Sequence, residues 1–452
     1  MRGAAKLAIW FSAFGVTLLA ILLFQLVFLP IIAPAWHAGS GLLVGGDWLG
    51  YHREAIELSE TIRADGWSSW TLRFRGHTVS GILGAIYAVV GPRPWAFAPI
   101  VAALQAVSFL AMVIIVGAFT GNETKPVLAA LPLLFFPSSL LWTLMPLKDG
   151  ISTCGFMLFL LGWFLVLRII RGQQVSLGKA ISATLCFVGG AGLVWIARPY
   201  MLILFQTLGA ICAVILSLRL AYLTWRRHLS WLVAEVTVVV LIVGLAIPTF
   251  FPTDAPTHEW KIIESGSEAY SGDVDVRTDW ERSTWLPTGI DTFFHVIADQ
   301  RDHSRFGYPD AGSNIDVDVG FSSAGQVLAY APRALQIALF APFPHQWIPG
   351  KSSGEGLGGL MRAISGLEMA FAYFIVPFFL IGLWHWRRRV EALLVLALCG
   401  AALIIQPLFV ANVGTIMRLR YPYHITLVCL GFGALLQYGP SIARRIRSLV
   451  IR

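Results

Sequence analysis

Short polar stretches interrupt an otherwise apolar sequence, and the first of them carries residue types that can do chemistry. Asp47, Tyr51 and Glu54 follow one another at helical spacing, so their side chains would share one face of a helix. A carboxylate on that face can take a proton from a hydroxyl group, or hold a divalent cation against a phosphate. A plainer interpretation makes Asp47 the cap of a helix that starts after a Gly-Gly turn.

The second polar stretch is a turn between two apolar segments, and it contains Lys148 and Asp149. A Lys-Asp pair at the edge of a bilayer costs free energy unless it is paired or used in function. Two interpretations stay open. Asp149 is a second functional carboxylate beside a cation, or it caps the following helix while Lys148 extends toward the headgroups.

Arginines form the third group of polar residues. Arg198 is followed by Pro199 and Tyr200, and Arg418 and Arg420 stand near the C-terminus. A guanidinium group binds phosphate through two parallel hydrogen bonds, and a lipid-linked phosphate lies at the depth of the headgroups. The alternative is that these arginines pair with the acidic residues of the first two stretches, or with ordinary lipids.

The composition around these residues is that of a membrane protein. Only 13% of the 452 residues are charged, whereas soluble proteins carry roughly 25%. The mean hydropathy of +0.71 excludes a soluble enzyme. The net charge of +8 does not indicate nucleic acid, because the cationic residues lie mainly at the ends of apolar segments. The five cysteines all lie in apolar segments, which favours small buried hydrophobes over disulfides or metal ligands.

Apolar segments long enough to cross a bilayer recur along the chain. They predict an all-α polytopic membrane protein of about ten transmembrane helices. The segments lie near residues 7–33, 95–119, 127–145, 150–170, 179–197, 200–220, 230–251, 366–385, 391–411 and 421–438. Two shorter apolar stretches, 79–90 and 327–343, contain Gly or Pro, and we expect them to form interfacial helices within loops.

The placement of Arg and Lys predicts the orientation. Basic residues gather at 168–179, 219–227, 387–389 and 444–447. With about ten spans, all four groups and both termini fall in the cytoplasm. This predicts a multi-pass protein of the inner (plasma) membrane.

Three regions follow from this topology. Residues 1–251 form an N-terminal transmembrane module with an extracytoplasmic first loop at 34–94. Residues 252–365 form a large, partly folded extracytoplasmic loop with an interfacial helix, and residues 366–452 supply the last transmembrane helices and a basic cytoplasmic tail. The large loop contains two Asp-x-Asp patterns, 273–275 and 316–318, which favour exposed strand faces over metal ligands.

The order of these features resembles the C-type membrane glycosyltransferases, the GT-C superfamily. Asp47 stands where that family has an acidic residue in the first extracytoplasmic loop, and Asp149 stands in the next such loop. The stretch 79–90 matches the interfacial helices of the family's first loop. The resemblance covers roughly the first 250 residues. It departs from the family at Trp48, because many members have Glu directly after the first Asp.

This resemblance implies a transferase that uses a polyprenyl-phosphate-linked sugar to build a cell-envelope or exported polysaccharide or glycolipid. Asp47 would be the general base or orient the acceptor, and Asp149 would support it or bind a cation. The donor phosphate would be held by Lys148, Arg198 and Arg420. The remaining substrate contacts would come from Tyr51, Glu54, Tyr200 and Arg418. A divalent cation is the one candidate cofactor, and no metal ligands can be assigned.

The partners implied are the lipid-linked sugar, membrane lipids, a glycan or lipid acceptor and polysaccharide-assembly proteins, with no nucleic acid. A weaker resemblance, in segments 342–345 and 412–422, is to Wzy-like polysaccharide polymerases. A polymerase would rely on arginines of the large loop, such as Arg301, Arg305 or Arg333. A transporter or flippase of lipid-linked glycans is a third reading, although it would favour ionisable groups at mid-bilayer.

Overall fold

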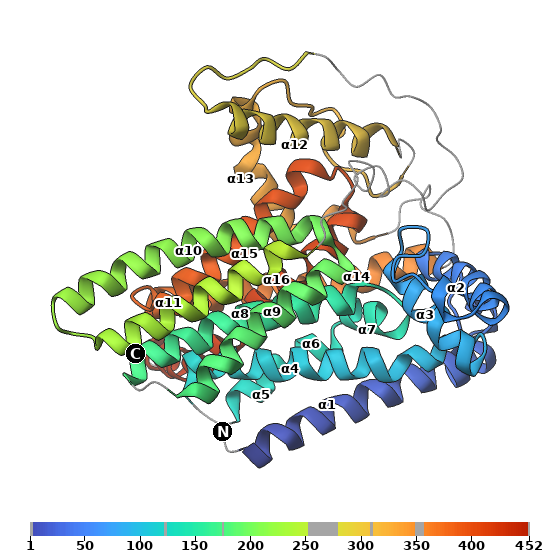
Figure 1. Ribbon diagram of the computed structural model, residues 1–452, viewed down its shortest axis with the longest axis horizontal. Helices are drawn as coiled ribbons and strands as arrows, with labels where there is room; N and C mark the ends of the chain where they lie inside the picture. The colour runs from blue at the N-terminus through green and yellow to red at the C-terminus, as the bar shows by residue number, and fades with distance from the viewer. Residues whose placement is uncertain are drawn as a thin grey trace. The chain divides into compact units, whose positions relative to one another are not determined.

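The computed structural model describes residues 3–121, 124–173, 176–251, 279–307, 311–348 and 357–450. Within these ranges the chain forms helices and loops, with isolated bridges but no strand (Figure 1). The all-α fold is therefore confirmed. Of the two Asp-x-Asp patterns, residues 273–275 lie outside the described residues, and residues 316–318 lie in a loop and not on a strand.

Sixteen α-helices are found in the described ranges. The long apolar ones are α1 (Gly3–Leu23, continued by a π-helix, Phe24–Ile32), α4 (Ala98–Thr120), α8 (Asp149–Gly172), α9 (Leu177–Ala197), α10 (Pro199–Trp225), α11 (Trp231–Ala246), α14 (Leu357–Trp386), α15 (Val390–Phe409) and α16 (Val413–Val450). The shorter ones are α2 (Asp47–Asp65), α3 (Thr78–Val90), α5 (Lys125–Ala130), α6 (Pro132–Phe135), α7 (Pro137–Leu144), α12 (Thr288–Gly307) and α13 (Ala324–Phe340).

In the described part of the chain, nine helices are long and apolar enough to cross a membrane. A tenth crossing is formed if the segments Lys125–Phe135 and Pro137–Leu144, bent by 59°, count as one span. The bend has a local cause, because the proline ring of Pro137 holds Phe136 in an extended conformation and so interrupts the helix. The chain is a multi-pass membrane protein, as the apolar segments predict. The stretches 79–90 and 327–343 form α3 and most of α13, and neither is among the candidate spans.

The chain divides into two compact units. Unit 1 comprises Met1–Ala255, Phe378–Val395 and Cys429–Arg452, and unit 2 comprises Pro256–Pro377 and Leu396–Val428. Helices α14, α15 and α16 therefore each contribute to both units.

The core of unit 1 is built on the antiparallel pair α8 and α9. Gly155 of α8 faces Gly190 of α9 so closely that a Cβ atom on Gly155 would stand 2.8 Å from the carbonyl oxygen of Gly190. Small residues at a crossing let two helix backbones approach within a membrane. Nearer the end of α8, the ring of Phe187 fills the space beside Gly162. This close contact sets how α8 and α9 pack along their length.

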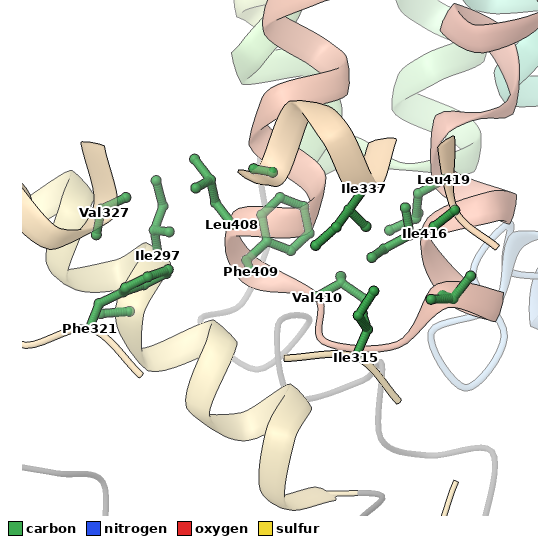
Figure 2. Close-up of a cluster of buried hydrophobic side chains, with 14 residues drawn as sticks. Ile297, Ile315, Phe321, Val327, Ile337, Leu408, Phe409, Val410, Ile416 and Leu419 are labelled. Carbon is green, nitrogen blue, oxygen red and sulfur yellow. The ribbon is translucent and has the colours of Figure 1, made fainter. Parts of the chain in front are cut away.

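In unit 2, α12 and α13 pack on the adjoining ends of α15 and α16. Figure 2 shows the buried apolar cluster that joins them. Ile297 comes from α12, Val327 and Ile337 from α13, and Phe409 and Ile416 from the two long helices. This cluster gives the polar part of unit 2 an apolar core of its own.

Candidate functional site

Helix α2 begins at Asp47, and the cap position belongs to Gly46. Gly46 has a φ of 97°, a conformation that favours glycine, and no side chain caps the helix. The interpretation of Asp47 as the cap is therefore wrong: it is the first helical residue, and it is exposed. A carboxylate in the first turn remains favourable beside the positive end of the helix dipole.

The loop before Asp47 is fixed to the rest of unit 1. The indole of buried Trp48 donates a hydrogen bond to the carbonyl of Leu43 at 2.6 Å. Gly41 has a φ of 80° and lies against Gln25, where a Cβ atom would stand 2.7 Å from the backbone oxygen. Gln25 in turn donates to the carbonyl of Leu144 at 2.6 Å. These contacts connect the first loop to the end of α7, just before the turn that holds Lys148 and Asp149.

Helices α2 and α3 lie side by side (Figure 1). Hydrogen bonds fix the segment around the start of α3 to the end of α9. Arg73 donates to the carbonyl of Trp195 at 2.8 Å, and its guanidinium lies 4.8 Å from the centre of that indole ring. The hydroxyl of Thr78 donates to the carbonyl of Ile196 at 2.6 Å. The first loop is thus attached two and three residues before Arg198.

Asp149 and Arg198 form a buried ion pair, with only 3% of each residue exposed. Asp149 is the first residue of α8, and Lys148 holds the cap position, so the capping interpretation of Asp149 is wrong. The glycine crossing of α8 and α9 brings these helix ends together. The Nε atom of Arg198 is buried and has no hydrogen-bond partner among the described residues. An unmet buried donor of this kind is uncommon and calls for an acceptor.

A second polar cluster lies between α2 and α3. Nδ1 of His77 is 2.9 Å and 3.1 Å from the two carboxylate oxygens of Glu54, and the hydroxyl of Ser80 donates to the same carboxylate at 2.6 Å. The ring of Tyr51 lies 5.0 Å from the imidazole, centre to centre. The side chains of His77 and Glu54 are 16% and 18% exposed, so the cluster is mostly covered but reachable.

The electrostatics of this cluster keep Glu54 ionised. Burial by itself raises the pKa of Glu54, but the hydrogen bonds from His77 and Ser80 and the charge of Arg75 outweigh it, so the pKa is lowered. The carboxylate therefore accepts hydrogen bonds and donates none.

Most predicted site residues lie in unit 1, on α2 in the first loop and at the turns before α8 and α10. These are Asp47, Tyr51, Glu54, Lys148, Asp149, Arg198 and Tyr200. Lys148 and Tyr200 are half-buried at the starts of α8 and α10. We call this end of unit 1, formed by α2, α3 and the turns before α8 and α10, the loop end.

Arg418 and Arg420 belong to unit 2. Arg420 is 2% exposed and donates to the carbonyls of Ile337, Ala338 and Ala341, at 3.0 Å and 2.7 Å for the first two. Its guanidinium therefore binds carbonyl groups in the last turn of α13 and just after it, where a helix leaves carbonyls unpaired; that of Ile337 also accepts the N–H of Ala341. The proposed role of Arg420 as a phosphate ligand stays a prediction. In the structure this side chain binds backbone carbonyls at the end of α13.

The arginines on which a polymerase would rely are engaged within unit 2. Arg301, 1% exposed, donates to the carbonyls of Val319 and Pro407, each at 2.7 Å. Arg333 makes a two-pronged ion pair with Asp316 at 2.8 Å and 2.9 Å. Arg305 pairs with Asp302, which lies one turn earlier on α12, at 2.6 Å.

Unit 2 also contains an open pocket of about 340 Å³ beside α12. Its lining combines carboxylates with aromatic rings, and it includes Asp279, Trp280, His295, Asp299, Asp318 and Phe321. Burial raises the pKa of Asp299. Among the described residues, no group of three or more His, Cys, Asp or Glu side chains could hold a metal ion, here or at the loop end.

Sequence reasoning missed His77 as a functional candidate. A histidine three residues before a serine at the start of an apolar stretch gives a weak signal, because its partner Glu54 lies on another helix. The register between α2 and α3 is set by Gly84, where a Cβ atom would stand 2.6 Å from the side chain of Leu58. No family model, curated protein or solved structure matches the chain.

Proposed function

We propose that this chain is a membrane glycosyltransferase that moves a sugar from a polyprenyl-phosphate carrier to a glycan or lipid acceptor. The observation that carries the proposal is the buried Asp149–Arg198 ion pair, together with the hydrogen bonds that hold the first loop to Trp195 and Ile196, just before Arg198. An exposed carboxylate, Asp47, starts α2 in that loop. The turns before α8 and α10 contribute the buried carboxylate of Asp149 and the buried guanidinium of Arg198.

This arrangement suits transfer from a lipid phosphate. The leaving group is the lipid phosphate itself, so the reaction requires no nucleotide. Asp149 orients the guanidinium of Arg198, and the unmet Nε–H of Arg198 is a donor that a phosphate oxygen would satisfy. Lys148 adds a positive charge at the same turn. Asp47 takes the proton of the acceptor hydroxyl or orients the acceptor.

The distribution of charge supports an orientation with the loop end outside the cytoplasm. Arg168 and Arg171 lie at the end of α8, and the Arg226–Arg227 pair follows α10, at the opposite ends of these helices from the loop end. Arg171 also pairs with Glu391, at the start of α15, at 2.5 Å. The positive-inside rule favours a cytoplasmic position for these ends. We propose that both termini are also cytoplasmic and that the membrane is the inner (plasma) membrane.

The polymerase reading has less support. Its candidate arginines, Arg301 and Arg333, hold loops of unit 2 and already have protein acceptors. The transporter reading calls for ionisable groups that line a path at mid-bilayer, whereas the Asp149–Arg198 pair stands at helix termini.

Lipid-linked glycan analysis by mass spectrometry tests the proposal, in cells that lack the protein and in cells that carry Asp47→Asn. We expect a single-sugar lipid donor or an unmodified acceptor to accumulate in both strains, because the variant removes the carboxylate charge at an exposed position. Full transfer by the variant would reject Asp47 as a site residue. Accumulation of complete, unpolymerised repeat units would instead identify a polymerase.

A further inference from the structure

The dyad of His77 and Glu54 joins two helices, and it also decides which nitrogen of the imidazole carries the proton. Because Glu54 is ionised and can only accept hydrogen bonds, the proton between the two residues belongs to Nδ1 of His77. A neutral imidazole with its proton on Nδ1 carries a lone pair on Nε2. Among the described residues no group makes a hydrogen bond to Nε2 of His77.

The other histidines of the first loop lack this arrangement. Nε2 of His37 already accepts the backbone N–H of Gly41 at 2.9 Å. His52 faces the hydroxyl of Tyr87 at 2.9 Å, which carries no charge and can donate or accept. Burial also lowers the pKa of His52, which disfavours its protonated form. Only His77, among these three, has a carboxylate behind Nδ1 that would stabilise an imidazolium ion.

We infer that His77 is the general base of the transfer, held in position by Glu54 at the loop end of unit 1. This inference rests on the proposed glycosyltransferase function. The acceptor hydroxyl gives its proton to Nε2 of His77 while its oxygen forms a bond to C1 of the donor sugar. The bond between C1 and the phosphate oxygen breaks, and its electron pair leaves with the lipid phosphate.

The surroundings of the dyad agree with this role. The titratable and charged groups that face it are Tyr51, on α2, and Arg75, in the turn before α3. Glu54 balances the positive charge that forms on the imidazole, and Ser80 keeps the carboxylate oriented. With His77 as the base, Asp47 orients the acceptor and does not receive its proton.

The first test needs no substrate. The full-length protein in lipid nanodiscs is treated with diethyl pyrocarbonate, which modifies an accessible imidazole nitrogen that carries a lone pair, and the modified peptides are identified by mass spectrometry. We expect His77 to react, and to react more slowly in Glu54→Gln, where the tautomer is no longer fixed. His37 is the internal comparison, because its Nε2 is occupied. An unreactive His77 would overturn the inference.

The second test separates the base from its structural bond. In His77→Asn the amide nitrogen takes the place of Nδ1, so the hydrogen bond to Glu54 is kept while the base is lost. We expect the thermal midpoint in detergent to stay close to that of the wild type, and transfer to fall by about 10²–10⁴-fold. His77→Ala should regain part of its activity when imidazole is added. The matched control is His52→Asn, for which transfer should fall by less than about tenfold.

The outcomes distinguish this inference from the proposed function. If the wild type transfers sugar and the transfer rate of His77→Asn is within about tenfold of the wild-type rate, His77 is not the base. The proposed transferase function is then unaffected. If the wild type transfers no sugar from any lipid-linked donor, the transferase fails, and the catalytic role of His77 fails with it even where the imidazole reacts with the probe.

Discussion

Three of the arginines buried in units 1 and 2 differ in their partners. In unit 2, Arg301 and Arg420 donate to backbone carbonyls, and these bonds hold loops and helix ends in place. In unit 1, Arg198 pairs with Asp149, and its Nε meets no acceptor among the described residues. Burial alone therefore does not mark an arginine as functional. In the proposed function the Nε–H of Arg198 is the donor that a phosphate oxygen would satisfy.

The largest expected effect comes from breaking the Asp149–Arg198 pair. Asp149→Asn leaves Arg198 as a buried charge without its counter-ion, so we expect unfolding to become easier by about 3–5 kcal/mol and transfer to be lost. Thermal unfolding in detergent and lipid-linked glycan analysis would measure the two effects.

The double variant Asp149→Leu with Arg198→Leu sharpens this prediction. Replacing a buried ion pair by apolar side chains often restores stability, so the double variant should fold about as well as the wild type. If its transfer activity also returned, the pair would be purely structural and the contrast between the two units would disappear.

A smaller effect is expected in unit 2, where Arg333 and Tyr330 bind Asp316. Their hydrogen bonds outweigh burial and lower the pKa of Asp316 below its ordinary value of 3.8. The folded state therefore favours the carboxylate, and its contribution of about 1–2 kcal/mol is complete above that ordinary value. The contribution is lost as the pH falls through the lowered folded-state pKa.

Thermal midpoints of wild type and Asp316→Asn, measured between about pH 3 and pH 7, check this dependence. The difference between the two proteins should shrink at the acidic end, and transfer per folded molecule at neutral pH should be unchanged. A loss of transfer in a well-folded Asp316→Asn variant would place unit 2 in the reaction.

The smallest effect is expected at the exposed pair of Arg75 and Glu57, which are 2.6 Å apart with side chains 60% and 48% exposed. Glu57→Gln should change the free energy of unfolding by less than about 1 kcal/mol and leave transfer intact. Differential scanning fluorimetry with a transfer assay would measure both. A large loss of transfer would show that the exposed face of α2 around Glu57 also takes part in the reaction.

The amino-acid sequence was sufficient to predict the membrane-spanning helices. Apolar length predicted the spans, because a helix must cover the hydrocarbon core whatever its neighbours are. The break near Pro137 and the helices α3 and α13 also left local signals in glycine and proline. The pairing of Arg198 with acidic residues was one of two readings of the sequence, and helix packing was needed to choose Asp149 as its partner.

Other features depended on contacts without a sequence signal. The partners of Arg420 are backbone carbonyls of α13, and any residue type supplies a carbonyl. The dyad of His77 and Glu54 depends on the register of two helices, which Gly84 and Leu58 set by shape. Periodicity within one segment reports neither kind of contact.

We propose that the reaction occurs at the loop end of unit 1. A direct test of this location compares two exposed aspartates, Asp47 of unit 1 and Asp318 of unit 2, each changed to asparagine in cells that lack the native protein. Mass spectrometry of the lipid-linked glycans should show donor or acceptor accumulating with Asp47→Asn and a wild-type profile with Asp318→Asn. Accumulation with Asp318→Asn, together with a wild-type profile for Asp47→Asn, would contradict the claim.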